Sequence, residues 1–357
     1  MAKFMIECLK ESPEVCNKLS SSNNTAEDLI KYYLEVAPSK LILIGSGSSN
    51  NIAQCSKQVL KKFLKVNVEI YTPIQFAMYE TECHEGALIL CLSQSGRSTN
   101  TIEALEAAKQ KGYKTAALTM VPNSPLSIHC EHVFEYGTYT GEQDSFVCRG
   151  FSASVTYFSI FAIKIALKKN YIKQNEYEKL IKDLLKITNS MSSLTTKTEI
   201  FFQDNKKDLF ATHRNMVMGM GNSSGIASES TLKFSETTGI PTNGYETEEF
   251  LHGPAFEVKK DHALFIYDID TKTHKRTLTI YEACKELCNR VYLISRFSDY
   301  GDNTIYFDIN VEESLLPILF VIPVQMLPGR ICEELGIRAI TINNYRASQI
   351  AVSKTDR

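Results

Sequence analysis

The sequence has little excess charge and no long uninterrupted apolar run, and these two shortages exclude several classes of protein. Its 39 basic and 41 acidic residues leave a formal net charge of −2, whereas a nucleic-acid-binding surface needs clustered positive charge. The longest apolar stretch, residues 315–327, is shorter than a bilayer-spanning helix and contains Pro317 and Pro323. The N-terminus carries charged residues in place of a signal peptide's apolar core. We therefore expect a cytoplasmic protein that binds neither nucleic acid nor a membrane.

Metal-ligand spacing is also missing from the ten cysteines, which are scattered along the chain. Cys284 and Cys288 lie four residues apart, but no second pair stands near them in the sequence, as a zinc site with four ligands requires. Several of the others stand in apolar runs, where cysteine acts as a small buried hydrophobic residue. We expect reduced thiols and no metal site.

The chain does contain one structural plan twice. An apolar strand, a Gly-x-Gly turn, paired serines and a helix follow one another at residues 41–63 and again at residues 216–237. Further short apolar runs alternate with helical segments, at 66–71, 87–92, 115–119 and 132–136, and then at 263–268, 290–294 and 304–309. This alternation predicts an α/β protein with two tandem parallel sheets, each flanked by helices in a doubly wound, flavodoxin-like arrangement.

Hydroxyl side chains are crowded onto the turn that follows the predicted strand at 87–92. Ser93, Gln94, Ser95 and Ser98 lead directly into a helical pattern. The unpaired N–H groups of a first helical turn and the helix dipole favour an anion there, phosphate above all. The hydroxyls can also cap the helix. The residues alone thus leave a phosphate site and a plain helix cap as alternatives.

The first Gly-x-Gly turn raises the alternative of a dinucleotide-binding fold. Gly45-x-Gly47-x-x-Asn50 lacks the third glycine that close helix–strand packing needs. The next predicted strand has Glu69 within it instead of an acid at its end. We therefore expect no nicotinamide cofactor, and no other cofactor.

Taken together, these motifs resemble the sugar isomerase (SIS) family over residues 30–345, as two SIS subdomains. The relatives with the most similar chemistry are the isomerase portion of glucosamine-6-phosphate synthase and the fructosamino-acid-6-phosphate deglycases. The resemblance implies that the two turns of the first subdomain bind a sugar phosphate. Arg97 stands where the synthase has an acid. The implied phosphate and sugar ligands are Gly47, Ser48, Ser49, Ser93, Gln94, Ser95 and Ser98.

A second match carries the chemistry. Glu229, Lys233 and Glu236 have the spacing i, i+4, i+7 and so share one helical face, a pattern that is otherwise typical of a solvated, salt-bridged stripe. Downstream, residues 248–254 resemble the family's acid-x-x-His-Gly-Pro signature, and the interval from Glu236 to His252 matches the family's interval between catalytic Glu and His. The resemblance implies that Glu236 moves a proton between sugar carbons, His252 helps to open the ring and Lys233 assists.

The C-terminal tail departs from the synthase, whose tail lysine forms a Schiff base with the open-chain ketose. Lys354 is the only lysine of this tail and stands a few residues out of register. It is either a catalytic lysine on a shifted tail or a solvated end. The sequence also shows no glutaminase-like segment, so we expect C–N chemistry in the direction of breakdown, or isomerisation without nitrogen.

These patterns predict an N-terminal helical arm (1–30), a phosphosugar-binding SIS subdomain (31–172), a helical linker (173–204), a catalytic SIS subdomain (205–345) and a tail (346–357). The predicted function is a deglycase, deaminase or aldose–ketose isomerase of a phosphosugar, and the alternative is a non-catalytic SIS-type sensor or regulator. The resemblance implies a homodimer or higher homo-oligomer with shared active sites. The apolar segment 315–327 then lies either in the subunit interface or in a helix inside one subunit.

Overall fold

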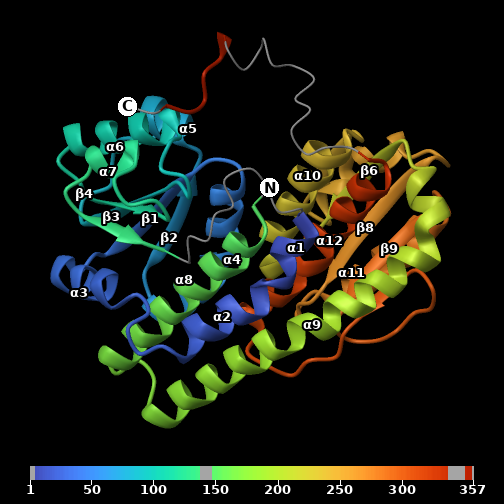
Figure 1. Ribbon diagram of the computed structural model, residues 1–357, viewed down its shortest axis with the longest axis horizontal. Coiled ribbons are helices and arrows are strands. Elements are labelled where there is room, and N and C mark those ends of the chain that lie inside the picture. Colours follow the sequence, from blue (N-terminus) through green and yellow to red (C-terminus); the bar gives the residue numbers. More distant parts are fainter. Residues whose placement is uncertain (1–4, 137–146, 337–349, 356–357) are drawn as a thin grey trace. The chain divides into compact units, whose positions relative to one another are not determined.

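The computed structural model describes residues 5–136, 147–336 and 350–355. The chain divides into two units, each with its own five-stranded sheet (Figure 1). Unit 1 comprises Met1–Glu14, Glu142–Ser152 and Asp183–Ile340, and unit 2 comprises Val15–Gly141, Ala153–Lys182 and Thr341–Arg357. Both sheets are parallel throughout, so the predicted α/β plan of two helix-flanked parallel sheets is confirmed.

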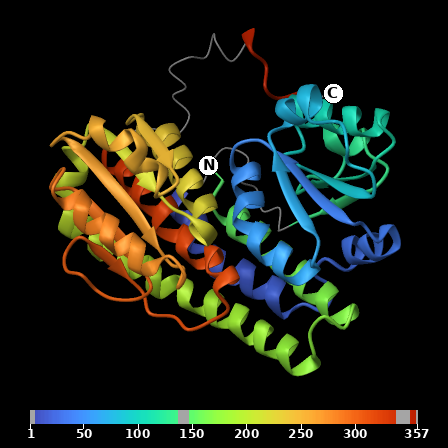
Figure 2. The ribbon, with the colours of Figure 1, turned by 180° about the vertical axis from the view of Figure 1, so that it is seen from behind.

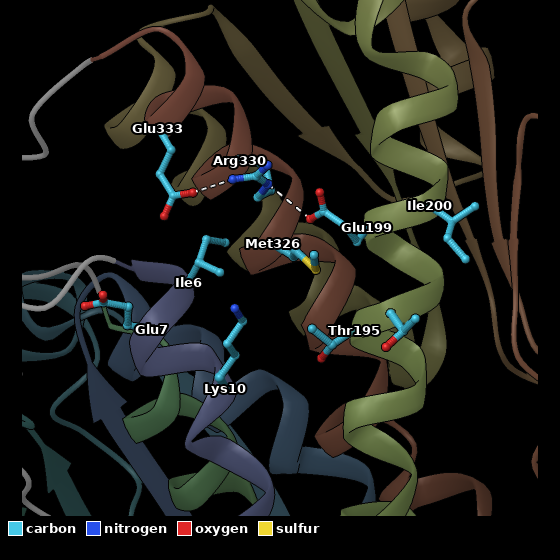
Figure 3. A pocket seen from close by; sticks show the side chains of 10 residues that line it. Ile6, Glu7, Lys10, Thr195, Glu199, Ile200, Met326, Arg330 and Glu333 are labelled. Carbon is cyan, nitrogen blue, oxygen red and sulfur yellow. Dashed lines mark hydrogen bonds and ion pairs between the residues drawn. The ribbon is translucent and has the colours of Figure 1, made fainter.

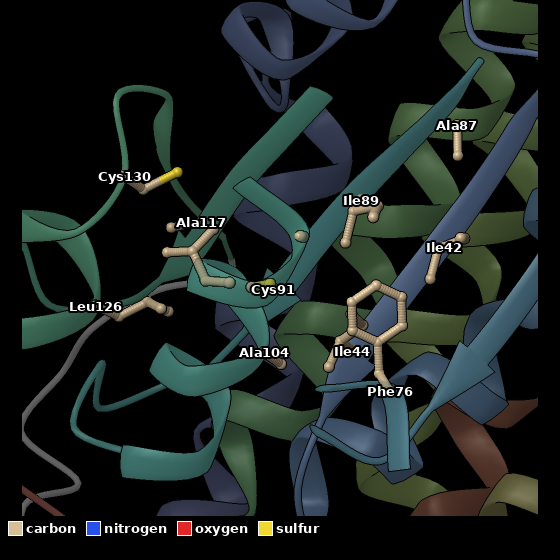
Figure 4. Packing of buried hydrophobic residues seen from close by; sticks show 12 residues of the cluster. Ile42, Ile44, Phe76, Ala87, Ile89, Cys91, Ala104, Ala117, Leu126 and Cys130 are labelled. Carbon is tan, nitrogen blue, oxygen red and sulfur yellow. The ribbon is translucent and has the colours of Figure 1, made fainter. Parts of the chain in front are cut away.

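The sheet of unit 2 has the strand order β2-β1-β3-β4-β5. Ile42, Ile89 and Ala117 on one face pack against Phe76 and Leu105 of the covering helices (Figure 4). The residues that alternate with them on β1 and β3 are also fully buried, because helices cover both faces of a parallel sheet. The strands are β1 (Lys40–Gly45), β2 (Asn67–Tyr71), β3 (Ala87–Leu92), β4 (Lys114–Thr119) and β5 (Val133–Glu135).

The helices of unit 2 up to β5 connect these strands or precede them. The two helices after the serine turns, which the sequence predicts from about residues 51 and 101, begin slightly earlier, at Ser48 and Thr99, so the serine turns lie directly at helix starts. The helices are α2 (Ser12–Ser21, which begins in unit 1), α3 (Glu27–Val36), α4 (Ser48–Leu64), α5 (Pro73–Tyr79), α6 (Thr99–Gln110) and α7 (Pro125–Ile128). Boundaries between the units fall inside α2, α8 (Arg149–Lys168) and α9 (Gln174–Phe210).

The sheet of unit 1 repeats the topology of the first, in the order β7-β6-β8-β9-β10. Leu264 packs in the cluster that includes Ile280 of α11, whereas Phe265, its neighbour in sequence, contacts Phe234 of α10 and Tyr292. Adjacent residues of β8 thus face helices on opposite sides of the sheet, and Figure 2 shows helices on both faces of this sheet. The strands are β6 (Arg214–Met218), β7 (Thr242–Tyr245), β8 (His262–Asp268), β9 (Val291–Ser295) and β10 (Thr304–Tyr306).

Strand β7 was not predicted, because its sequence Thr-Asn-Gly-Tyr is short and polar and contains a glycine. It forms at the sheet edge by pairing with β6. The other helices of unit 1 are α1 (Met5–Lys10), α10 (Ser224–Thr238), α11 (His274–Lys285) and α12 (Pro317–Glu334), with the 3₁₀ helices η1 (Gly221–Ser223), η2 (Glu249–His252), η3 (Pro254–Glu257) and η4 (Glu313–Leu315).

The apolar segment 315–327 is a core helix of unit 1 and not an interface. It forms most of α12, which packs against α10 and α1, and its side chains are buried within the chain. Of the two alternatives, the helix inside one subunit is therefore correct. Two helical stretches, Arg149–Lys168 and Glu313–Glu334, are long and apolar enough to cross a membrane by length and composition, but 94% of each apolar window is buried. Core helices of soluble proteins pass the same test, so these two are weak grounds for a membrane span.

Candidate active site

The first serine turn lies between β1 and α4 in unit 2. Gly47, with φ of 55°, ends the turn in a backbone conformation that L side chains rarely adopt. Ser48 and Ser49 follow in the first turn of α4, and both are buried. The start of this helix therefore combines hydroxyl groups with the positive end of the helix dipole.

The second serine turn lies between β3 and α6 of the same unit. The Ser93 hydroxyl donates to the Ser98 hydroxyl at 3.2 Å, and the Arg97 backbone N–H donates to the Ser95 hydroxyl at 3.4 Å. Gly96 has φ of 66°, and a Cβ there would lie 1.9 Å from the Ser124 hydroxyl, so a larger residue would displace this turn. Because β1 and β3 are adjacent strands, the two serine turns lie at the same edge of the sheet.

Two further polar side chains belong to this edge. Asn100 donates from Nδ2 to the Ser46 hydroxyl at 2.9 Å and so joins the two turns directly. Gln94 donates from Nε2 to the Ser154 hydroxyl of α8 at 3.4 Å. This bond links the second serine turn to α8. Sequence reasoning missed Asn100, although its position in the first turn of a helix that follows a central strand is a usable signal.

The C-terminal tail pairs with the second serine turn. Lys354 forms an isolated antiparallel bridge with Ser98, the Thr355 N–H donates to the Arg97 carbonyl at 2.8 Å, and the Thr99 N–H donates to the Ser353 carbonyl at 3.1 Å. Lys354 is exposed and lies beside the predicted phosphate ligands. Residues 346–349 of the predicted tail fall outside the described ranges.

The acidic helix face is largely buried, contrary to the alternative of a solvated stripe. Glu229 and Lys233 of α10 are 0% and 1% exposed, and the Lys233 ammonium lies 3.3 Å from Glu229 and 2.5 Å from Glu236. Burial alone would lower the pKa of Lys233, but the two carboxylates raise it above its ordinary value. The Glu236 side chain is 29% exposed, so one carboxylate of a buried ion group reaches the surface of unit 1.

The loop that carries His252 is held by acidic side chains. The Glu246 carboxylate accepts the N–H groups of Glu248 and Glu249 at 2.7 and 3.0 Å. Glu248 makes two parallel bonds to Arg276, at 2.6 and 2.9 Å, a geometry that fixes both partners. His252 ends η2 and is exposed. The predicted residues thus lie in both units: the serine turns and Lys354 in unit 2, and Glu236, Lys233 and His252 in unit 1.

Unit 1 also has a cavity of about 570 Å³ between α1, α9 and α12 (Figure 3). The Arg330 guanidinium lies beside it, 2.6 Å from Glu333 and 3.1 Å from Glu199, and Lys10 points into it. None of the predicted site residues lines this cavity. Among the residues that the structure describes, no cluster of three His, Cys, Asp or Glu side chains is placed to hold a metal ion.

Comparison with known proteins gives the chain its family. The SIS domain model matches residues 34–162 and 208–330. A glutamine–fructose-6-phosphate aminotransferase (isomerizing) of Caldanaerobacter subterraneus is 25% identical over 332 residues, which are 89% of this chain and 52% of that protein. The chain thus spans about half the length of the curated relatives that it matches.

Solved structures share the fold. A protein of Clostridium difficile 630, provisionally assigned as a phosphosugar isomerase, has a TM-score of 0.89 at 22% identity and covers 99% of this chain, with 100% of its own length matched. Glucosamine-6-phosphate deaminase of Thermotoga maritima has a TM-score of 0.71 at 20% identity, with 93% of this chain and 96% of the deaminase covered. Because the SIS model matches most of the chain in two stretches that correspond to the two sheets, this protein belongs to the SIS domain family.

Proposed function

We propose that this protein is an enzyme that acts on a ketose, aldose or amino-sugar 6-phosphate by proton transfer through an enediol or enolamine. The observation that carries the proposal is the buried ion pair of Glu229 and Lys233, whose ammonium also contacts the partly exposed carboxylate of Glu236. A surface stripe would have no reason to bury a lysine and a glutamate completely. Buried charge next to an accessible acid is typical of catalytic sites.

The proposed substrate is anchored by its phosphate in unit 2. The starts of α4 and α6 offer backbone N–H groups and helix dipoles, and Ser48, Ser49, Ser93, Ser95 and Ser98 add hydroxyl donors. Remote binding of the phosphate orients the carbon atoms that react. The bond from Asn100 to Ser46 holds the two turns together as one site.

The proposed chemistry belongs to unit 1. Glu236 removes a proton from one sugar carbon and returns it to the next, a type of catalysis that contributes about 10²–10⁴-fold. The ammonium of Lys233 lies 2.5 Å from that carboxylate and stabilises the negative charge that develops on the substrate oxygen. His252 assists ring opening, since an imidazole ring can both donate and accept a proton.

Deglycase, deaminase and isomerase reactions all pass through such an intermediate. The matched relatives include an aminotransferase of fructose 6-phosphate and a glucosamine-6-phosphate deaminase, and these names favour a reaction at a C–N bond. We therefore propose cleavage of an amine from a phosphosugar as the first reaction to test, with aldose–ketose isomerisation as the second.

A panel of 6-phosphates of glucose, fructose, glucosamine, galactosamine, tagatose and fructoselysine tests this proposal. The substrate should raise the thermal unfolding temperature, because a ligand at 100 times its Kd stabilises the folded state by about 2.7 kcal/mol. Product analysis should then find a free amine or a new reducing sugar. The unphosphorylated sugars are the matched controls. Binding without any product would contradict the enzyme and favour a non-catalytic sensor.

We further propose that Lys354 condenses with the open-chain carbonyl of the substrate, since it lies beside the second serine turn. The amine and the carbonyl would form an imine with loss of water, and borohydride would reduce it to a stable secondary amine. Mass spectrometry should locate the added sugar on Lys354, and Lys354→Met should lose it. Labelling that is unchanged in this variant would show that Lys354 is only a solvated end.

A homodimer or higher homo-oligomer with shared active sites is also proposed. Phe256, four residues after His252, is 92% exposed, and a partner surface that covered its ring would remove apolar area from water. The proposed surface is a second copy of the chain, into whose site His252 enters. Mixing His252→Asn and Glu236→Gln subunits should then restore about a quarter of wild-type activity. About half of the randomly formed dimers contain one subunit of each kind, and in each of these one of the two sites has both an intact Glu236 and an intact His252. No restoration after exchange would refute shared sites.

The proposed location is the cytoplasm. All ten cysteines lie in the described part of the chain and form no disulfide, and nine of them are buried, as in proteins of reducing compartments.

A further inference from the structure

The two sheets share a topology, so their carboxyl edges can be compared residue by residue. In unit 2, Ile44 pairs with Cys91, and Ser95 stands four residues after Cys91. In unit 1, Met218 pairs with Ile266, and Asp270 stands four residues after Ile266. Ile44 and Met218 each immediately precede a Gly-x-Gly turn. Asp270 of the second sheet is therefore the counterpart of the predicted phosphate ligand Ser95.

The turn between β6 and α10 has a matching counterpart. Asn222 follows Gly219-Met220-Gly221 as Ser48 follows Gly45-Ser46-Gly47. The backbone N–H of Asn222 donates to Oδ2 of Asp270 at 2.9 Å, and its side-chain amide donates to Oδ1. The two positions that we expect to bind phosphate in unit 2 thus bind each other in unit 1.

The carboxylate of Asp270 is buried at the carboxyl edge of the sheet of unit 1. Asp270 is 7% exposed, and a Cβ on Gly221, which has φ of 62°, would lie 2.9 Å from its Oδ2. Burial raises the pKa of Asp270, and the two hydrogen bonds from Asn222 oppose that rise. Its backbone carbonyl accepts the His274 N–H at 3.0 Å. Asp270 therefore ties the loop after β8 to η1, which leads directly into α10, and to the start of α11.

We propose that Asp270 is a built-in anion, which occupies in the second repeat the place of the substrate phosphate in the first and positions the helix that carries Glu229, Lys233 and Glu236. This inference rests on the proposed function for the identity of the anion in unit 2. It deepens that function in two ways. Each chain binds one phosphosugar, in the first repeat only, and Asp270 is a positioning residue for the catalytic acid.

Substitution with chemical rescue tests the positioning role. Asp270→Ala should lower kcat about ten- to a hundredfold, because a small displacement of a catalytic group has effects of this size, while KM for the phosphosugar changes little. Formate fits the space of the removed carboxylate and should restore much of the lost kcat. Asp299→Ala, which removes an exposed carboxylate that also accepts a backbone N–H, should show neither effect. Unchanged kcat, or a loss that formate does not reverse, would overturn the proposal.

A second measurement does not need turnover. In protein labelled with ¹⁵N-asparagine, formate should shift the backbone amide resonance of Asn222 in the Asp270→Ala variant and leave the wild-type resonance in place. An Asn222 resonance in the variant that formate does not move would refute the built-in anion, whatever the phosphosugar panel shows. If the alanine variant does not fold, Asp270→Ser replaces it, because the hydroxyl can accept the N–H bond and still leaves room for formate.

Discussion

Glu236→Gln should abolish turnover while the phosphosugar still binds. The amide keeps the size of the carboxylate and can still accept a hydrogen bond from Lys233, but it cannot take a proton from carbon. The rate should fall by at least about 10²–10⁴-fold, the usual contribution of a general base. Because the proposed phosphate ligands lie in unit 2, the ligand-induced rise in unfolding temperature should remain. Single-turnover kinetics and thermal unfolding with the active phosphosugar measure the two effects.

The matched control is Glu286→Gln, which removes an exposed carboxylate from unit 1 just after α11. It should keep nearly the wild-type rate, since Glu286 is not among the residues that we place in the site. Solvent deuterium exchange at the substrate carbon gives a further readout, because it should stop in Glu236→Gln and continue in the control. A Glu236→Gln variant that turns over at the wild-type rate would remove Glu236 from the role of base.

Most of the framework was predictable because its signals are local. The strand β3 has the bounds that its unbroken apolar run predicts, Ala87–Leu92, since a strand covered on both faces needs apolar side chains at every position. The Gly-x-Gly turns mark the strand–helix junctions of β1 and β6, where positive φ at Gly47 and Gly221 excludes most other residues. Both the repeat and the serine turns follow from such signals.

The features that sequence reasoning missed depend on long-range contacts. The bond from Asp270 to Asn222 joins residues 48 positions apart, and the bond from Asn100 to Ser46 joins residues 54 positions apart. The i, i+4 spacing of Glu229 and Lys233 is the same on an exposed helix and on a buried one. Glu229 and Lys233 become buried only because α12 packs on α10. The same packing covers the apolar segment 315–327, so the expectation that this segment lies in a subunit interface is wrong.

Lys233→Met should destabilise the folded protein strongly, by about 3–5 kcal/mol, because it removes one partner of a buried ion pair. Methionine fills a similar volume, so the loss would come from the Glu229 carboxylate, which is 0% exposed and loses the ammonium 3.3 Å away. Urea unfolding followed by circular dichroism measures the change. If Lys233 lay on an exposed helix face, its replacement by methionine would change the free energy of unfolding by less than about 0.5 kcal/mol. A measured change that small would contradict the buried arrangement.

The double variant Glu229→Gln with Lys233→Met separates charge from packing. Removing both charges should recover part of the stability, because replacing a whole buried ion pair is often close to neutral.

The pH dependence of the stability that Lys233 contributes has a defined sign. The pKa of Lys233 is raised above its ordinary value of 10.5, so its stabilising effect is fully present below that value and is lost only as the pH rises through the higher folded-state pKa. The Lys233 ammonium itself should therefore not titrate between about pH 6 and 9. A stability difference between wild type and Lys233→Met that shrinks as the pH rises through this range would mean that Lys233 loses its proton near neutrality, which would contradict its raised pKa.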